Sequence, residues 1–525
     1  MNIDERYLSD AAHYPGGHAA GLAVPRTVDE IPAIVRGASA VLVTGAQSSL
    51  TGGATPMGEV LLSTEKLTRI LELTSSSIRV EAGVSVAAMD EALAARGAWF
   101  PPAPTYTGAF AGGIVATNAA GAATFKYGSV RGWVEALTLV LADGSELAIE
   151  RGKVRARDGV LIVPPGLWPA LDPARAREGR SYEISVPTYR MPAVPKRSAG
   201  YHAEPGMDLI DLFIGSEGTL GVITTATFRV LSPAPTSALA FVPCVSEAQA
   251  LALVGDLRSA SQETWRTRDP HGIDAAAIEH MDRRCLDILQ EDGADRTHGV
   301  RWPDATALAL LVQIELPAGT TGRDGFDQIQ SALSNAKTDS ALGRFCRLLA
   351  SHGLFDDTEM ALPGNLRRAH QLIALREAVP EGVNQRVGDA QRRIDPRIAK
   401  TAADMVVPFE RFGEMMQIYR DGFGSRGLDF AVWGHISDGN VHPNVLPRSY
   451  ADVERGKDAI LQFGREVARL GGCPLAEHGV GRNPVKQALL RQLYGDAGIA
   501  EMRAVKRALD PEWKLAPGVI FPKRP

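Results

Sequence analysis

The sequence predicts an α+β fold in which an N-terminal region of many short strands precedes a mixed α/β region with an antiparallel sheet. Short apolar runs separated by glycine turns recur before residue 232. After that point, longer periodic segments typical of helices alternate with strands. The chain has 525 residues, of which 45% are hydrophobic and 22% charged, as is usual for a globular protein with several cores.

The first predicted domain, residues 1–231, contains more strand-like than helix-like segments. Strands are expected at residues 40–43, 60–62, 78–82, 136–141 and 222–230. Helices are expected at 28–36 and 86–96. The Ser-Pro-Ala-Pro segment at 232–235 then predicts a domain boundary, because proline interrupts both helices and central strands.

The second predicted domain, residues 232–475, alternates helical patterns with strands. Helices are expected at 247–259, 275–290 and 325–335, and a strand at 307–315. Residues 476–525 form a last segment that returns to the first domain. Its helix, 484–509, is capped by Asn483 and begins with Pro484, whose missing N–H costs nothing at that position.

Charge and composition exclude several classes of protein. The formal net charge of -5 argues against nucleic acid as a partner, because phosphate binding needs a basic surface. The four cysteines form no CxxC pair, so an iron–sulfur centre and a disulfide framework are not expected. The polar N-terminus lacks a secretory signal, and the uncharged stretch 99–125 is too rich in glycine for a membrane span. A cytoplasmic protein is expected, with peripheral membrane association and a homodimer both left open.

Four glycine-rich segments point to a long ligand. In the first, 41–53, a strand leads into a loop of small residues whose N–H groups can surround a pyrophosphate. It matches neither the Walker loop nor GxGxxG, and alone it is as typical of an ordinary turn. Three similar segments, 111–121, 126–131 and 213–224, indicate a ligand contacted mostly by backbone.

These segments, in this order, resemble the FAD-linked oxidases of the vanillyl-alcohol oxidase superfamily over residues 24–231. The resemblance implies a PCMH-type FAD-binding domain of two subdomains. The first and second segments lack the His or Cys of covalently flavinylated relatives, so the FAD is expected to be non-covalent. The resemblance implies contacts to the pyrophosphate from Thr44, Gly45, Ala46, Gln47, Ser48 and Ser49. It implies contacts to the ribityl and flavin parts from Pro104, Thr105, Thr107, Gly112, Gly113, Ala116, Thr117, Asn118 and Gly121, and further contacts from Gly218, Ile223, Glu477 and His478.

Residues 430–445 predict a hairpin that presents two imidazoles. The Asp438-Gly439 pair between apolar runs is a strong two-residue turn signal. With that turn, His435 pairs with His442, and both share a face with Asn444. The alternative is a pair of ordinary surface histidines. The apolar character of the opposite face favours a divalent-metal site.

Two motifs, GHxxDGNxHxN in the hairpin and EHGxG at 477–481, resemble the D-2-hydroxyacid dehydrogenase branch of this superfamily over residues 235–522. That branch includes D-lactate dehydrogenases, D-2-hydroxyglutarate dehydrogenases and the glycolate oxidase D subunit. The resemblance implies that His435, His442 and Glu477 bind the metal, with Zn²⁺ expected first and Mn²⁺ second. It further implies that Asn444 contacts the substrate and that His478 is the general base.

A 2-hydroxy acid is an anion and should bind Arg or Lys. Arg376 lies in a segment resembling the one that holds the substrate carboxylate in the family. Lys400 is the weaker candidate, because its spacing to Asp404 departs from the family pattern. Lys196 and Tyr201 belong to a family-like segment that approaches the flavin.

The predicted reaction is oxidation of a D-lactate-like 2-hydroxy acid to the 2-oxo acid, with hydride transfer to flavin N5. Electrons would leave to a quinone, a cytochrome or an electron-transfer flavoprotein. Two alternatives remain. A non-redox transferase of the alkyl-ether-lipid synthase type should carry a run of histidines, which this sequence lacks. A non-catalytic FAD-binding subunit of a glycolate-oxidase-like complex would have no need of the intact hairpin and the Glu477-His478 pair.

Overall fold

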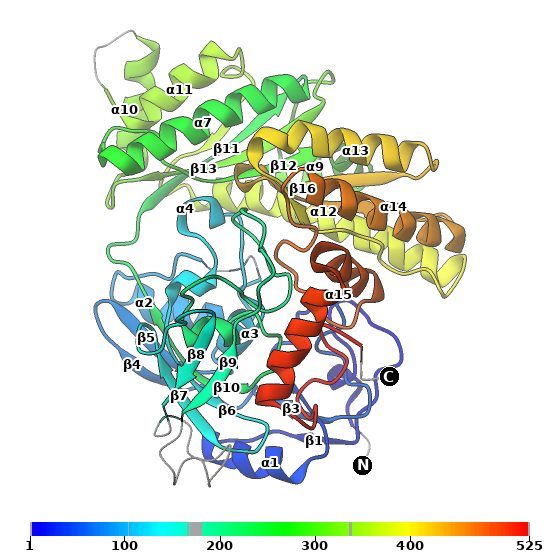
Figure 1. Ribbon diagram of the computed structural model, residues 1–525. Helices are drawn as coiled ribbons and strands as arrows, with labels where there is room; N and C mark the ends of the chain where they lie inside the picture. The colour runs from blue at the N-terminus through cyan, green and yellow to red at the C-terminus, as the bar shows by residue number, and fades with distance from the viewer. Residues whose placement is uncertain are drawn as a thin grey trace. The chain divides into compact units, whose positions relative to one another are not determined.

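The computed structural model describes residues 3–102, 104, 106–164, 167, 181–334 and 339–522 (Figure 1). The chain divides into two compact units. Unit 1 comprises Met1–Gly121, Gly128–Ser232 and Cys473–Pro525. Unit 2 comprises Ala122–Tyr127 and Pro233–Gly472.

Within its described residues, unit 1 contains three sheets. The parallel sheet has the order β1-β3-β2, from strands Gly21–Ala23, Val60–Ser63 and Val41–Thr44. The antiparallel sheet has the order β4-β5-β10-β6-β7, from Ile70–Leu73, Ser77–Glu81, Val222–Arg229, Val134–Val140 and Glu146–Glu150. The third sheet pairs β8 (Val160–Val163) with β9 (Tyr182–Ser185).

The helices of unit 1 are short except for the last. They are α1 (Ile31–Gly37), α2 (Val86–Ala94), α3 (Ala111–Ala116), α6 (Leu209–Phe213) and α15 (Pro484–Leu509), with 3₁₀ turns η1 (Glu5–Tyr7), η2 (Val28–Glu30) and η3 (Val130–Trp133). Asn483 caps α15 through the N–H groups of Val485 and Lys486, as its position in the sequence predicts. The expected single helix is, however, interrupted at Gly495, where φ is 68°.

Among the described residues, unit 2 is built on one antiparallel sheet of order β14-β11-β13-β12-β16-β17-β15. Its strands are Glu359–Ala361, Thr236–Cys244, Leu308–Leu316, Ala275–Asp282, Phe430–His435, Asn440–Val445 and Met405–Val406. Its helices are α4 (Thr124–Tyr127), α7 (Glu247–Thr267), α8 (Arg283–Glu291), α9 (Ala294–His298), α10 (Gly322–Leu333), α11 (Ala341–Ser351), α12 (Leu366–Arg393), α13 (Phe412–Gly424) and α14 (Tyr450–Arg469), with 3₁₀ turns η4 (Phe409–Arg411) and η5 (Ile436–Asp438). In the described part of the chain, no helix combines the length and the apolar character that crossing a membrane requires.

One face of this sheet packs against α8 and α12. Apolar side chains of both helices, such as Leu286 and Leu372, share a buried cluster with Phe241, Leu311 and Trp433 of the strands. A cluster of this kind fixes the position of α12 over the sheet, because protein interiors are close-packed. The polar residues described below lie on α12, β12 and the hairpin β16-β17.

The helix expected at 275–290 is wrong in its first half. Residues Ala275–Asp282 form the central strand β12, and only Arg283–Glu291 are helical. The alanine-rich start has high helix propensity, but both faces of this strand are buried, and such packing overrides propensity. Asp282 caps α8 by accepting the N–H of Cys285 at 2.9 Å.

Candidate functional site

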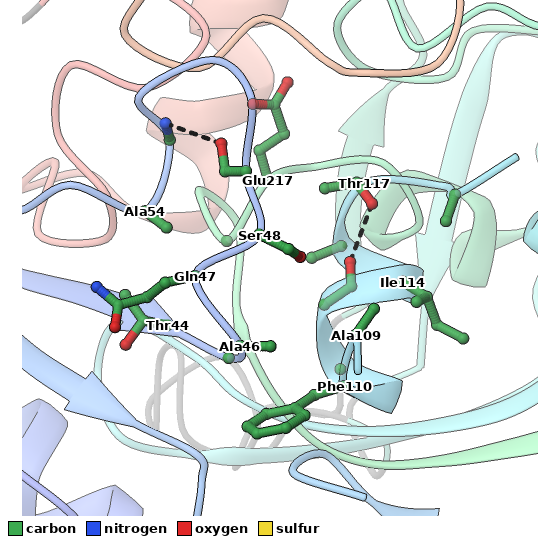
Figure 2. Close-up of a pocket in the computed structure, with 18 of the residues that line it drawn as sticks. Thr44, Ala46, Gln47, Ser48, Ala54, Ala109, Phe110, Ile114, Thr117 and Glu217 are labelled. Atoms are coloured by element: carbon green, nitrogen blue, oxygen red, sulfur yellow. Dashed lines mark hydrogen bonds between the residues drawn. The ribbon is translucent and has the colours of Figure 1, made fainter. Parts of the chain in front are cut away.

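A cavity in unit 1 is lined by residues from the predicted cofactor segments. Figure 2 shows Ala46, Gln47 and Ser48 of the loop after β2, Thr117 beside α3, and Glu217 around it. Among the residues expected to contact FAD, those that line the cavity are Thr44, Gly45, Ala46, Gln47, Ser48, Ser49, Pro104, Gly112, Gly113, Ala116, Thr117, Gly218, Ile223, Glu477 and His478. Thr107, Asn118 and Gly121 do not line it, and Thr105 lies outside the described residues.

The glycines of α3 leave room for a ligand. A Cβ atom at Gly113 would meet nothing within 4 Å, so this helix position faces open space. On the packed side, a Cβ at Gly112 would lie 2.8 Å from the Cβ of Ala82, which explains the small residue there. The cavity wall is therefore mostly backbone and small side chains, which suits a long cofactor such as FAD.

Asn118 does not line the cavity, and its side chain instead binds the third glycine-rich segment. It adopts a left-handed conformation, with φ of 50°, and its Oδ1 accepts the N–H of Arg131 at 3.0 Å. The Arg131 guanidinium donates to the carbonyl oxygens of Asp211 at 2.5 Å and Ile214 at 2.6 Å. Burial lowers the pKa of Arg131 to about 10, which leaves it cationic at neutral pH. Arg131 thus ties the second glycine-rich segment to the fourth.

Glu477 and His478 both line the cavity of unit 1. The Nζ of buried Lys196 lies 3.0 Å from Oε2 of Glu477, and Nε2 of His478 lies 3.4 Å from Oε1 of Glu477. Lys196 was expected to approach the flavin, and the structure places it against Glu477. Tyr201, from the same segment, is fully buried, and its hydroxyl lies 2.7 Å from Oγ1 of Thr219.

Glu217 lines the same cavity, although it is not among the residues predicted from the sequence to contact FAD. Its carboxylate accepts the N–H groups of Val480 and Gly481, each at 2.8 Å. Burial raises its pKa to about 7, although both hydrogen bonds oppose the rise. The sequence does single out this residue, because Glu217 is the one acidic residue within the four glycine-rich segments.

The hairpin in unit 2 forms with a different register from the one expected. His435 pairs with Asn440, and His442 pairs with Trp433. The turn is a 3₁₀ turn, Ile436–Asp438, followed by Gly439 with φ of 80°, so four residues and not two connect the strands. The pairing is shifted by two residues, and a shift of two preserves the face on which each side chain lies. The rings of His435 and His442 are consequently close, with centroids 5.6 Å apart.

His435 belongs to a buried polar group with Glu279 of β12 and Arg376 of α12. Oε2 of Glu279 lies 3.2 Å from Nδ1 of His435 and 3.0 Å from Nη2 of Arg376. All three residues are at most 9% exposed. Desolvation alone would raise the pKa of Glu279, but Arg376 and His435 outweigh it and lower the pKa to about 2.

His442 has a similar carboxylate partner. Its Nδ1 lies 3.3 Å from Oδ1 of Asp404, which also accepts a hydrogen bond from Nδ2 of Asn440 at 3.1 Å. Asp404 is 1% exposed. Each imidazole therefore has its Nδ1 next to a buried carboxylate, a contact that directs the Nε2 atom away from that carboxylate.

The remaining predicted residues of unit 2 differ in burial. Asn444 is buried, and its Nδ2 donates to the carbonyl oxygen of His442 at 2.9 Å. Within the described residues, Oδ1 of Asn444 and Nε of Arg376 are buried without a hydrogen-bond partner. Lys400 is exposed. The structure thus brings together His435, His442, Asn444 and Arg376, and leaves Lys400 at the surface of its unit.

Comparison with known proteins identifies both halves of the chain. Residues 246–520 match the family model of the FAD linked oxidases, C-terminal domain, and residues 19–150 match an FAD binding domain. The chain is 27% identical over 512 residues to a D-2-hydroxyglutarate dehydrogenase of Xanthomonas citri pv. viticola, covering 95% of this chain and 89% of that one. It is 26% identical over 510 residues to a D-lactate dehydrogenase of Archaeoglobus fulgidus (95% and 90%) and to glycolate oxidase subunit GlcD of Bacillus subtilis (95% and 88%).

Among solved structures, an alkyldihydroxyacetonephosphate synthase matches with a TM-score of 0.56 and 14% identity, covering 96% of this chain and 76% of that one. At this identity the match concerns the fold alone, and it confirms the predicted α+β class with a PCMH-type FAD-binding domain. The predicted superfamily is confirmed by the two family matches. The chain belongs to the FAD linked oxidases and is an FAD-dependent oxidoreductase.

Proposed function

We propose that the protein oxidises a D-2-hydroxy acid to the corresponding 2-oxo acid, with the substrate hydride passing to FAD. The observation that carries this proposal is the buried group of Arg376, His435 and His442 in unit 2. A guanidinium that shares a carboxylate partner with one of two neighbouring imidazoles can bind the carboxylate of a small molecule whose hydroxyl is held by a metal. The three relatives named above are named for D-2-hydroxyglutarate, D-lactate and glycolate, which are all 2-hydroxy acids.

Arg376 is the proposed carboxylate-binding residue. Its Nη2 atom contacts Glu279, while its Nε atom is buried without a partner among the described residues. A buried, unsatisfied N–H group costs about 1–3 kcal/mol, so an arriving carboxylate oxygen would relieve that cost. Glu279 orients the guanidinium. Lys400 is not included in this step, because it is exposed.

His435 and His442 are the proposed ligands of a divalent metal, with Zn²⁺ first and Mn²⁺ second. Their Nδ1 atoms lie beside Glu279 and Asp404, an arrangement that favours the tautomer in which the Nε2 lone pair can bind a metal ion. Glu477 is proposed as a third ligand from the EHGxG resemblance, and Asn444 as a substrate contact. When bound, such an ion acts as a Lewis acid that lowers the pKa of the substrate hydroxyl.

His478 is the proposed general base, which accepts the hydroxyl proton. It lines the unit 1 cavity, and Glu477 lies beside its Nε2 atom. Bound FAD would supply the redox chemistry as the hydride acceptor at N5. The FAD is proposed to be non-covalent, so that acid precipitation should release the yellow colour into the supernatant. Electrons would then pass to a quinone, a cytochrome or an electron-transfer flavoprotein.

Anaerobic titration with a panel of D-2-hydroxy acids tests the proposal. At least one acid should bleach the flavin absorbance of the wild type and yield the 2-oxo acid, whereas its L-enantiomer should not. The variant His478→Ala should keep its FAD but lose reduction by about 10²- to 10⁴-fold, the usual contribution of a general base. Wild-type protein that no 2-hydroxy acid reduces would contradict the proposal and favour a transferase or a non-catalytic subunit.

A further inference from the structure

Glu217 links two segments of the cavity wall. Its Oε1 accepts the N–H of Val480, and its Oε2 accepts the N–H of Gly481, each at 2.8 Å. Both carboxylate oxygens therefore accept hydrogen bonds from backbone N–H groups, which belong to the second and third residues after His478. Gly479 has a φ of 75°, which favours glycine, and a Cβ there would lie 2.9 Å from Oε1.

The turn that presents Glu217 is held in place from several sides. Glu217 has a φ of 52°, a left-handed conformation that is costly for a residue other than glycine. Its N–H donates to the carbonyl oxygen of Ala116, beside the glycines of α3, at 2.8 Å. The Nζ of buried Lys506 donates to the carbonyl oxygen of Thr219 at 2.5 Å. These contacts hold the turn, and with it the Glu217 carboxylate, in place.

The far end of the same loop is attached to the first glycine-rich segment. The N–H groups of Arg482 and Asn483 both donate to the carbonyl oxygen of Thr51 at 3.0 Å. The Arg482 guanidinium donates to the carbonyl oxygen of Thr55 at 3.1 Å and contacts Glu59 at 3.1 Å. His478 therefore lies in a loop whose C-terminal half is tied to two walls of the cavity. The Glu217 contacts fix the backbone directly after the histidine, and the Lys196 contact with Glu477 holds the residue before it.

We infer that Glu217 is a positioning residue for the oxidation: its carboxylate fixes the backbone after His478 and thereby fixes the direction of the imidazole in the cavity. This inference rests on the proposed role of His478. A base displaced by about 1 Å can lose on the order of 10² in rate, because proton transfer needs hydrogen-bond geometry. Arg376, which we propose to bind the substrate, belongs to unit 2 and would be unaffected.

The variant Glu217→Gln tests this directly. Its amide NH₂ would face one of the two N–H donors, so that one hydrogen bond is lost while size and shape are kept. We expect the limiting rate of anaerobic flavin reduction to fall about 10- to 100-fold, with little change in substrate KM or FAD affinity. Glu217→Asp, which keeps both oxygens and the charge, should recover part of the rate.

Asp208→Asn is the matched control. Asp208 is a buried carboxylate of unit 1 that also accepts two backbone N–H groups, from Gly152 at 2.5 Å and Ile210 at 3.3 Å, but it does not line the cavity. It should lose a similar amount of thermal stability and keep the wild-type reduction rate. If Glu217→Gln also keeps the wild-type rate, the carboxylate is only a structural element and the inference is overturned. If that variant does not fold, the same criterion applies to Glu217→Asp.

A second readout separates this inference from the proposed function. If no 2-hydroxy acid reduces the wild type, the proposed function fails, and the reactivity of His478 can still be measured. Diethyl pyrocarbonate modification, followed residue by residue with peptide mass spectrometry, should be several-fold faster at His478 in Glu217→Gln and unchanged in Asp208→Asn. Equal rates in all three proteins would overturn the positioning role.

Discussion

Oε2 of Glu279 lies within hydrogen-bond distance of both the Arg376 guanidinium and the His435 imidazole. One oxygen atom thus orients the proposed carboxylate-binding residue and one proposed metal ligand. Substitutions at Arg376 and His435 should therefore be strongly non-additive, because residues that share a partner are energetically coupled.

The depressed pKa of Glu279 predicts a loss of stability in acid. Its pKa is about 2 in the folded protein against an ordinary value of 4.5, so the stabilisation is complete above pH 4.5 and is lost as the pH falls towards 2. This contribution is about 3 kcal/mol at neutral pH. In urea unfolding at several pH values, the difference in stability between wild type and Glu279→Gln should shrink below pH 4.5. A difference that stays constant with pH would contradict the assignment.

Metal affinity should depend on the carboxylates next to the histidines. Replacing Asp404 by Asn or Glu279 by Gln leaves a poorer acceptor for the Nδ1–H of His442 or His435. Loss of such a partner typically weakens metal binding 10- to 100-fold. Competition with a chromophoric chelator measures this without any activity assay. Asp458→Asn, an exposed residue of α14 paired with Arg426, is the control and should bind metal like the wild type.

The two histidines could be predicted from the sequence, whereas their carboxylate partners could not. His435 and His442 are close along the chain, and strand alternation is enough to place them on one face. Glu279 is 156 residues from His435, and its segment has the composition of a helix. Such pairs depend on how the strands assemble, which local patterns do not encode.

At the scale of elements, the sequence predicts which face of the hairpin each side chain occupies but not which residues pair across the two strands. Asp438-Gly439 is typical of a two-residue turn, but here Gly439 only ends a 3₁₀ turn. Tertiary contacts select the longer loop: Arg258 donates to the carbonyl oxygen of Ser437, and the Ser437 hydroxyl accepts the N–H of Ile278 at 3.3 Å. The glycine-rich segments could be predicted more readily than the hairpin register, because an excess of small residues near a ligand is visible in the local composition.

Gly434 is the most constrained position of the hairpin strands. Its φ is 148°, and a Cβ there would lie 2.7 Å from both the carbonyl oxygen of Asn440 and the Cα of Val441. Gly434→Ala should lower the free energy of unfolding by about 1–3 kcal/mol, since backbone atoms of the paired strand must move. Because His435 is adjacent, metal affinity should fall as well.

Urea unfolding with Gly424→Ala as the control tests that prediction. A Cβ at Gly424, the last residue of α13, would meet nothing within 4 Å. That variant should be neutral or more stable by less than about 1 kcal/mol. Equal stabilities of the two variants would show that the hairpin tolerates a side chain at Gly434.

At the scale of the whole molecule, unit 1 is assembled from three separated stretches of sequence. Its C-terminal stretch completes both the core and the cavity wall. Leu515 belongs to the same apolar cluster as Ile31 and Val41, and the N–H of Val41 donates to the carbonyl oxygen of Lys514 at 2.8 Å. Retention of FAD should therefore depend on residues that begin about 250 positions after the last glycine-rich segment.

Removal of residues 473–525 should abolish FAD binding, because it deletes part of the core and part of the cavity wall. Flavin absorbance of the purified protein measures this. Leu515→Ala is a milder version that keeps the chain intact; a buried Leu→Ala change costs about 2–5 kcal/mol, so FAD should be released at a lower temperature than in the wild type. A truncated protein that purifies yellow would contradict the prediction.

The assignment of residues Ala122–Tyr127 to unit 2 limits how this chain can be recombined with a relative, in evolution or by design. They follow a glycine-rich segment of unit 1, yet they pack with unit 2, where Lys126 contacts Asp274 and Glu315 at 2.6 Å each. A genetic exchange at the Pro-containing segment 232–235 would separate Lys126 from both carboxylates and the C-terminal stretch from its core. Recombination between relatives should thus succeed only when Ala122–Tyr127 and Pro233–Gly472 come from one parent and Cys473–Pro525 comes from the same parent as the rest of unit 1.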